Sequence, residues 1–287
     1  MEKVIFDGEY FSVKDTLECG QVFRFCVHQK GYLVYSVDKC AYAYNDNDLA
    51  VIECQEEDVE YFKNYFDIER DYQKIVLSAQ NEDVNILREA STLGKGIRIL
   101  NQNTEETLFS FIISQNNNIP RIKGIIEKLC TALGEKKVFN GQTYFAFPKA
   151  EEMAKMPLDF FCSIGLGYRA SYIKKLSESI VSGLDISGYR EYKTEQLKKK
   201  LIEIYGVGPK VADCVSLFGF HRSDSFPVDT WIEKVYVQDF MGKEKNRNKI
   251  TEYFTNRFKD KSGYYQQYLF HYKRKLETDK KTTENKK

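Results

Sequence analysis

The sequence predicts an α+β fold, in which an N-terminal antiparallel β-sheet region is followed by a mainly α-helical region. Short β-rich runs separated by turn signals fill the first 54 residues. Apolar residues then recur at helical spacing, beginning with Val59, Phe62 and Phe66. We therefore expect an N-terminal sheet domain with a helical end at 1–95, a helical domain at 96–277 and a disordered polar tail at 278–287.

The individual elements follow from local signals along the chain. Strands are expected at 22–27, 32–37, 41–44 and 49–54, the last after an Asn-Asp-Asn-Asp turn. One helix is expected to start with Thr104 as its N-cap, because two glutamates follow in the first turn. Apolar periodicity predicts further helices at 121–133, 157–162, 170–182, 194–205, 209–218, 229–239 and 263–276.

Composition places the chain among globular proteins. Of its 287 residues, 42% are hydrophobic and 14% aromatic, which is too apolar for a disordered chain. No apolar run approaches the ~20 residues of a membrane span. The first residues also lack the apolar stretch of a secretory signal. We therefore expect no membrane association and a cytoplasmic location, with the nucleoid as the place of action in a bacterium.

Charge and cysteine usage limit the possible partners and metals. The net charge of +1 is not that of a protein that coats nucleic acid, so phosphate affinity must come from a local patch. The candidate patches are the lysines at 198–200 and the basic residues between 243 and 261. Seven cysteines without C-x-x-C spacing argue against a disulfide framework and against a zinc site.

The segment 201–214 carries the strongest chemical signal. It predicts a helix, a tight turn and a second helix, because Gly206 and Gly208 bracket Val207. The free N–H groups at the start of the second helix are a ready site for a phosphate. Lys210 lies in that first turn, where the helix dipole and the expected burial disfavour its protonated form. A lysine in this position is suited to act as a nucleophile.

Together with Pro-Val-Asp at 227–229, this segment resembles the helix-hairpin-helix of a superfamily of DNA glycosylases. The resemblance implies that Lys210 attacks C1′ of the damaged nucleotide and that Asp229 assists. It implies that the hairpin binds the DNA backbone through Gly206, Gly208 and Val211. It also implies a structural K⁺ or Na⁺ held by the backbone carbonyls of Ile202, Ile204 and Val207.

Two segments resemble the DNA-reading loops of one branch, the 8-oxoguanine DNA glycosylases. In the segment Ser-Gln-Asn-Asn-Asn-Ile-Pro-Arg, Asn116 is implied to fill the gap left by the expelled base. Arg121 is implied to read the cytosine left behind, for which the guanidinium fork is suited. In Gly-Leu-Gly-Tyr-Arg-Ala, Tyr168 is implied to wedge into the base stack and Arg169 to contact the cytosine.

Two further segments resemble the base pocket of the same branch. The carbonyl of Gly20, in Cys-Gly-Gln-Val-Phe-Arg, is implied to accept the N7–H of the oxidised base, whereas guanine has an acceptor at N7. Gln266 and Phe270 are four residues apart and so share a helix face. They are implied to bind the Watson–Crick edge of the flipped base and to stack on its ring. Cys214 is implied to form another pocket wall.

The resemblance covers nearly the whole chain and implies a base-excision repair enzyme. It would be a bifunctional DNA N-glycosylase and AP lyase that excises 8-oxoguanine, preferably opposite cytosine, through a lysine Schiff base. The implied partner is double-stranded DNA containing 8-oxoguanine, and we expect a monomer. No cofactor is implied to be required. Since no cysteine follows Cys214, the chain also differs from glycosylases that carry an iron–sulfur cluster. Two alternatives stay open, a non-catalytic helix-hairpin-helix DNA-binding module and a glycosylase for alkylated purines.

Overall fold

The N-terminal part of the chain forms a five-stranded antiparallel sheet in the order β1-β5-β4-β3-β2. The computed structural model describes residues 1–284, with side chains described through Glu277. The strands are β1 (Glu2–Asp7), β2 (Phe25–His28), β3 (Gly31–Ser36), β4 (Lys39–Asp46) and β5 (Leu49–Cys54). The predicted sheet followed by a mainly helical region is confirmed, although β1 was not predicted.

The rest of the chain is mainly helical. The helices are α1 (Val13–Glu18), α2 (Val59–Tyr65), α3 (Tyr72–Gln80), α4 (Asn85–Leu93), α5 (Thr104–Ser114), α6 (Ile119–Leu133), α7 (Ala150–Lys155), α8 (Leu158–Ser163), α9 (Ala170–Val181), α10 (Thr194–Ile202), α11 (Pro209–Phe218), α12 (Thr230–Asp239), α13 (Arg247–Phe258) and α14 (Ser262–Glu284). The bounds of α11 are those predicted from the sequence. The N-cap of α5 is Asn103 rather than Thr104, because the Asn103 side chain accepts the N–H of Glu106 at 3.0 Å.

Two hydrophobic cores stabilise these parts. One face of the sheet packs on α1 and α2 through Leu17, Phe62 and Phe66. A larger core joins α3–α6 with the helices that follow. Because Tyr72, Leu87 and their neighbours belong to this larger core, α3 and α4 pack with the helical part. The boundary predicted at residue 95 therefore does not coincide with the division between the cores.

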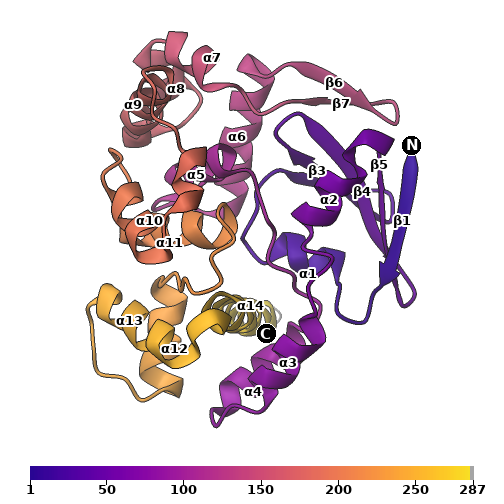
Figure 1. Cartoon of the computed structure of the whole chain (residues 1–287), viewed down its shortest axis with the longest axis vertical. Coiled ribbons are helices and arrows are strands. Elements are labelled where there is room, and N and C mark those ends of the chain that lie inside the picture. The colour runs from indigo at the N-terminus through magenta and orange to yellow at the C-terminus, as the bar shows by residue number, and fades with distance from the viewer. Residues whose placement is uncertain (285–287) are drawn as a thin grey trace.

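A small hairpin connects the helical part to the outer face of the sheet. It consists of β6 (Lys136–Phe139) and β7 (Gln142–Phe145). The turn between them is Asn140-Gly141, with φ of 47° and 74°, an Asn-Gly signal that the sequence analysis missed. Phe139 packs against the outer face of the sheet, and Figure 1 shows the hairpin extending over it.

The last helix packs among other helices in the lower half of the view in Figure 1. Figure 1 shows α14 nearly end-on, between α12 and the α3–α4 pair. The helix continues to Glu284, so most of the polar tail predicted at 278–287 is helical, and residues 285–287 lie outside the described residues. Lysine and glutamate are good helix formers, and an established helix extends easily into such a segment. Across residues 1–284, no helix is both long and apolar enough to cross a membrane.

Candidate active site

A small pocket lies where α1, α11, α12 and α14 converge. Its lining residues are Gly20, Phe111, Lys210, Cys214, Phe218, Pro227, Asp229, Gln266, Gln267 and Phe270. The six residues predicted for catalysis and for base recognition are all among them. The volume is about 60 Å³, far below the ~300 Å³ at which ligand pockets usually begin. Entry of a purine base therefore requires the side chains of the walls to move apart.

Lys210 lies at the start of α11, directly after Pro209 in the first turn. Gly208 is the N-cap residue and provides no side-chain cap, so the positive end of the helix dipole lies beside the lysine. Its ammonium nitrogen is 5.6 Å from the centre of the Phe111 ring. The residue is exposed, which corrects the expectation of burial. The space beside the N-cap is open, since a Cβ on Gly208 would meet no described atom within 4 Å.

Asp229 lines the same pocket and is fixed as the N-cap of α12. Its Oδ1 accepts the N–H groups of Trp231 and Ile232, each at 3.0 Å. Burial raises the pKa of the Asp229 carboxyl, while these two N–H groups and the positive charge of Lys210 act in the opposite direction. The buried Pro227-Val228 segment leads into the cap. The carboxylate is therefore held in one orientation beside the nucleophile candidate.

The base-pocket candidates surround these two residues. Gly20 has φ of +90°, which only glycine adopts readily, and a Cβ there would lie 3.3 Å from Phe270 Cε1. The Gln266 amide donates to the Pro227 carbonyl at 3.2 Å, whereas its Oε1 has no hydrogen-bond partner among the described residues. Burial raises the pKa of the Cys214 thiol to about 11, so this wall of the pocket is uncharged. The pocket thus offers an acceptor, an amide and an aromatic face.

A second group of predicted residues forms an exposed surface beside the pocket. Asn116 has φ of 45°, a conformation that asparagine tolerates, and its side-chain amide donates to the Tyr168 hydroxyl at 3.3 Å. Tyr168 is 51% exposed. Arg121 is also exposed and donates to the carbonyl of Gly165 at 3.2 Å. Residues from α6 and from two loops therefore meet on one surface.

Arg169 does not belong to this exposed group. Its side chain is buried and donates to the carbonyl of Gln115 at 2.7 Å and to that of Asn116 at 3.0 Å. These carbonyls lie at and just beyond the end of α5, where helix acceptors lack intrahelical partners. In this structure the Arg169 side chain holds the asparagine loop from its buried side, and its contact with a cytosine stays a prediction.

Gln115 connects the asparagine loop to the glycine hairpin. Its side-chain amide donates to the carbonyl of Gly206 at 2.9 Å. Gly206 has φ of +90° and lies against Tyr172, where a Cβ would approach within 2.4 Å. Val211 is buried, so only its backbone N–H is available to a phosphate. The hairpin and the asparagine loop are consequently held next to each other.

The hairpin carbonyls have the chemistry that the expected cation needs. Hard cations bind oxygen ligands, and backbone carbonyls are among them. The carbonyls of Ile202 and Val207 lie in the same turn as that of Ile204, which accepts the N–H of Val207 at 3.0 Å. Among residues 1–277 there is no group of three or more His, Cys, Asp or Glu side chains arranged to hold a metal ion.

The two basic patches predicted from the sequence differ in how far their charges are paired. Each lysine at 198–200 forms an ion pair with an acidic neighbour, and in the second patch Arg247, Lys249 and Arg257 do the same. Residues 243–261 carry seven basic and three acidic side chains, so the second patch keeps an excess of positive charge. It stays a candidate for phosphate binding, together with backbone N–H groups of the hairpin and the exposed cations beside the pocket.

Comparison with known proteins decides the family. A family model described as "HhH-GPD superfamily base excision DNA repair protein" matches residues 109–260. The chain belongs to this superfamily. A second model, the N-terminal domain of 8-oxoguanine DNA glycosylase, matches residues 3–108. Both catalytic candidates of this family member, Lys210 and Asp229, lie within the first model.

Two solved structures resemble the chain over nearly its full length, and a yeast relative resembles about half of it. The structure of MBOgg1 in complex with a low affinity DNA ligand superposes with a TM-score of 0.90 at 37% identity, covering 96% of each chain. The Clostridium acetobutylicum 8-oxoguanine glycosylase/lyase, in complex with double-stranded DNA containing cytosine opposite 8-oxoG, gives 0.89 at 33%, covering 94% and 93%. The Saccharomyces cerevisiae N-glycosylase/DNA lyase is 35% identical over 171 residues, which are 55% of this chain and 45% of the yeast protein.

Some pocket residues of this family member escaped the sequence analysis. Phe111, Phe218 and Gln267 line the pocket, yet each lies on a helix whose other apolar residues are core. Gln267 is adjacent to Gln266 in a polar pair within an aromatic stretch, which is an unusual feature at a buried position. That pair was a usable signal for a second functional glutamine.

Proposed function

We propose that this family member is a bifunctional DNA N-glycosylase and AP lyase that excises 8-oxoguanine from duplex DNA. The observation that carries the proposal is that Lys210 and Asp229 line one pocket with Gly20, Gln266 and Phe270. A nucleophile, a carboxylate and base-recognising groups thus converge in one small space. The similarity to a solved 8-oxoguanine glycosylase/lyase at 33% identity supports the same activity.

The proposed reaction assigns each pocket group a role. After giving up a proton, the amine of Lys210 attacks C1′ of the flipped nucleotide, and the bond from C1′ to the base breaks as the base leaves with its electron pair and takes up a proton. The C1′–O4′ bond then breaks, O4′ takes a proton from the nitrogen, and the resulting Schiff base with the opened sugar permits β-elimination of the 3′ phosphate. The Asp229 carboxylate stabilises the positive charge that develops on the sugar. The carbonyl of Gly20 accepts the N7–H that distinguishes the oxidised base from guanine.

The exposed surface beside the pocket would face the strand opposite the lesion. Asn116 and Tyr168 fill the space left by the flipped base, and this offsets the few kcal/mol that unstacking costs. Arg121 reads the unpaired cytosine, since its guanidinium matches acceptors on the base edge. We therefore propose that excision is fastest opposite cytosine.

The test is base release from duplexes that differ only in the lesion and the opposing base. The proposal predicts release of 8-oxoguanine, with the fastest rate opposite cytosine, and none of an alkylated purine such as 3-methyladenine. Preferential release of the alkylated purine would identify an alkylpurine glycosylase. Binding without release of either base would leave only a DNA-binding module. Equal rates against all four opposing bases would contradict the role given to Arg121.

The remaining expectations follow from the same activity. We propose that the enzyme acts as a monomer on double-stranded DNA, in the cytoplasm and on the nucleoid if the cell is bacterial. No cofactor takes part in the proposed steps. A K⁺ or Na⁺ bound by the carbonyls of Ile202, Ile204 and Val207 would help to hold the hairpin, without a role in bond breaking.

A further inference from the structure

The backbone segment that carries Gly20 is clamped by side chains from α14. We infer that Gln267 and Arg274 are positioning residues for 8-oxoguanine recognition, because they fix the orientation of the Gly20 carbonyl. This inference rests on the proposed function, in which that carbonyl selects the oxidised base. It adds two residues that have no role in the bond-breaking steps proposed above.

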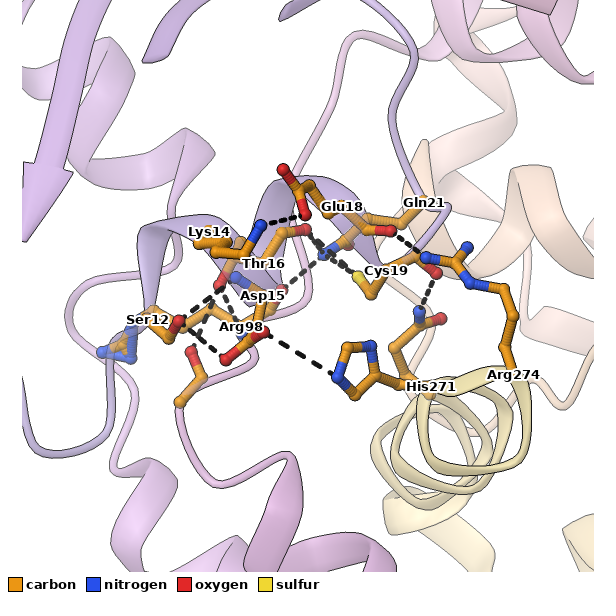
Figure 2. Close-up of polar contacts among 12 residues, drawn as sticks. Ser12, Lys14, Asp15, Thr16, Glu18, Cys19, Gln21, Arg98, His271 and Arg274 are labelled. Carbon is orange, nitrogen blue, oxygen red and sulfur yellow. Dashed lines mark hydrogen bonds and ion pairs between the residues drawn. The ribbon is translucent and has the colours of Figure 1, made fainter. Parts of the chain in front are cut away.

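The clamp acts on the last peptide groups of α1. The amide of Gln267 donates to the carbonyl of Cys19 at 2.8 Å, and the Arg274 guanidinium donates to the carbonyl of Glu18. Cys19 is fully buried and Gln267 is 2% exposed, so the first of these bonds is shielded from water. Figure 2 shows Arg274 reaching from α14 to the end of α1, with Cys19 beside it.

The segment after Gly20 is held just as firmly. The Gln21 amide donates to the carbonyl of Thr16 at 2.9 Å and to that of Arg98 at 2.7 Å, while its Oε1 accepts the N–H of Leu100 at 2.8 Å. Gly20 is therefore the single glycine between two fixed peptides. Its φ of +90° lies in a region where glycine is permissive and supplies no restraint of its own. Its carbonyl direction depends on the groups that hold its neighbours.

The helix α14 carries both the side chains that face the pocket and those that hold the Gly20 segment. Gln266 and Phe270 are four residues apart and form the stripe that faces the pocket. Gln267 and Arg274 are seven apart and form the adjacent stripe, which faces α1. The base-contacting side chains and the clamp of the selecting carbonyl are therefore parts of one rigid element. A shift of α14 would move both together.

Recognition through a single carbonyl is sensitive to small displacements. A hydrogen bond weakens steeply when its angle falls below about 120°, and a misplacement of about 1 Å at a reacting group can lower a rate about 100-fold. Removing the Gln267 donor leaves the buried Cys19 carbonyl without that partner, and the segment will turn to find another. The loss of rate should therefore be confined to steps that require recognition of the base.

The decisive variant is Gln267→Leu, assayed in two ways on the full-length protein. Single-turnover release of 8-oxoguanine opposite cytosine should fall about 10- to 100-fold. Borohydride trapping on a duplex with a preformed abasic site opposite cytosine should change less than about twofold, because that substrate has no base for Gly20 to recognise. Arg274→Met should give the same selective loss.

The matched control is Tyr272→Phe, which removes a hydrogen bond from the same helix to Glu89 on α4. It should leave both reactions at wild-type rates. Equal loss of release and trapping in Gln267→Leu would indicate general damage and overturn the clamp, as would wild-type release. Failure of the wild-type protein to release 8-oxoguanine would overturn the proposed function and the clamp with it.

Discussion

Asp229 has two separable tasks, and two substitutions at this position distinguish them. Its Oδ1 caps α12 by accepting two backbone N–H groups, and its negative charge lies beside Lys210. Asp229→Asn keeps an oxygen that can accept the same bonds but removes the charge. Asp229→Ala removes both. The pair of variants therefore measures the cap and the charge independently.

The magnitudes follow from the contacts. Losing an N-cap costs about 1–2 kcal/mol, so Asp229→Ala should destabilise the protein by that amount, whereas asparagine caps nearly as well as aspartate and should cost under about 0.5 kcal/mol. Loss of one preorganised electrostatic group lowers kcat about 10²- to 10³-fold. That corresponds to ~3–4 kcal/mol of transition-state stabilisation. Both variants should show this loss of activity.

Urea unfolding and single-turnover release of 8-oxoguanine are the two assays. The reasoning predicts Asp229→Asn to be as stable as the wild type yet at least about 100-fold slower. An asparagine variant that releases the base at nearly the wild-type rate would show that the charge is not used. An asparagine variant as unstable as the alanine variant would refute the cap assignment.

Three further predictions follow from the geometry. Gly20→Ala should lose base release but keep trapping on an abasic site. The φ of +90° costs a residue with a Cβ about 1–2 kcal/mol, and the new atom would lie 3.2 Å from Arg274 Nη1. Equal loss of both reactions would contradict this prediction. Arg24→Ala should destabilise the protein by about 3–5 kcal/mol in urea unfolding, because it leaves the Glu106 carboxylate, whose side chain is only 12% exposed, without its 3.3 Å ion pair; a loss under about 1 kcal/mol would be inconsistent. Since burial raises the pKa of Asp229, the acid limb of the release profile should lie above the ordinary aspartate value near ~3.9 and vanish in Asp229→Asn. The same shift means that this carboxyl's contribution to stability falls as pH rises through that range, because the folded state binds the proton more tightly.

Much of the fold was predictable because local and tertiary preferences agree. The bounds of β5 and α11 match the predictions, since each is delimited by strong signals: an Asn/Asp turn before β5, and the glycines around Val207 before α11. The strand β1 was missed because it pairs with β5, which lies far along the chain, and its residues alternate weakly. Pairing over such a separation cannot be inferred from local pattern.

The sequence predicted which residues form the site better than it predicted their conformation and burial. The residues that the sequence placed in the pocket do converge there, because their motifs include the turns that position them. The sequence did not reveal that two carbonyls at the end of α5 accept hydrogen bonds from the Arg169 guanidinium, because these contacts join residues 53 and 54 positions apart. Lys210 was expected to be buried because the sequence shows its place in the first turn of α11 but not its surroundings. The open space beside Gly208 is visible only in the structure. Gln267 was missed because its partner, the carbonyl of Cys19, is 248 residues away in sequence.

The most direct test of the account is borohydride trapping on a duplex that carries one 8-oxoguanine opposite cytosine. We expect a covalent protein–DNA adduct with the wild-type protein and none with Lys210→Gln, although the variant should still bind the lesion duplex. An adduct of undiminished yield in Lys210→Gln would show that another amine forms the Schiff base. Base release by the wild type without any adduct would mean that water, and not Lys210, attacks the sugar.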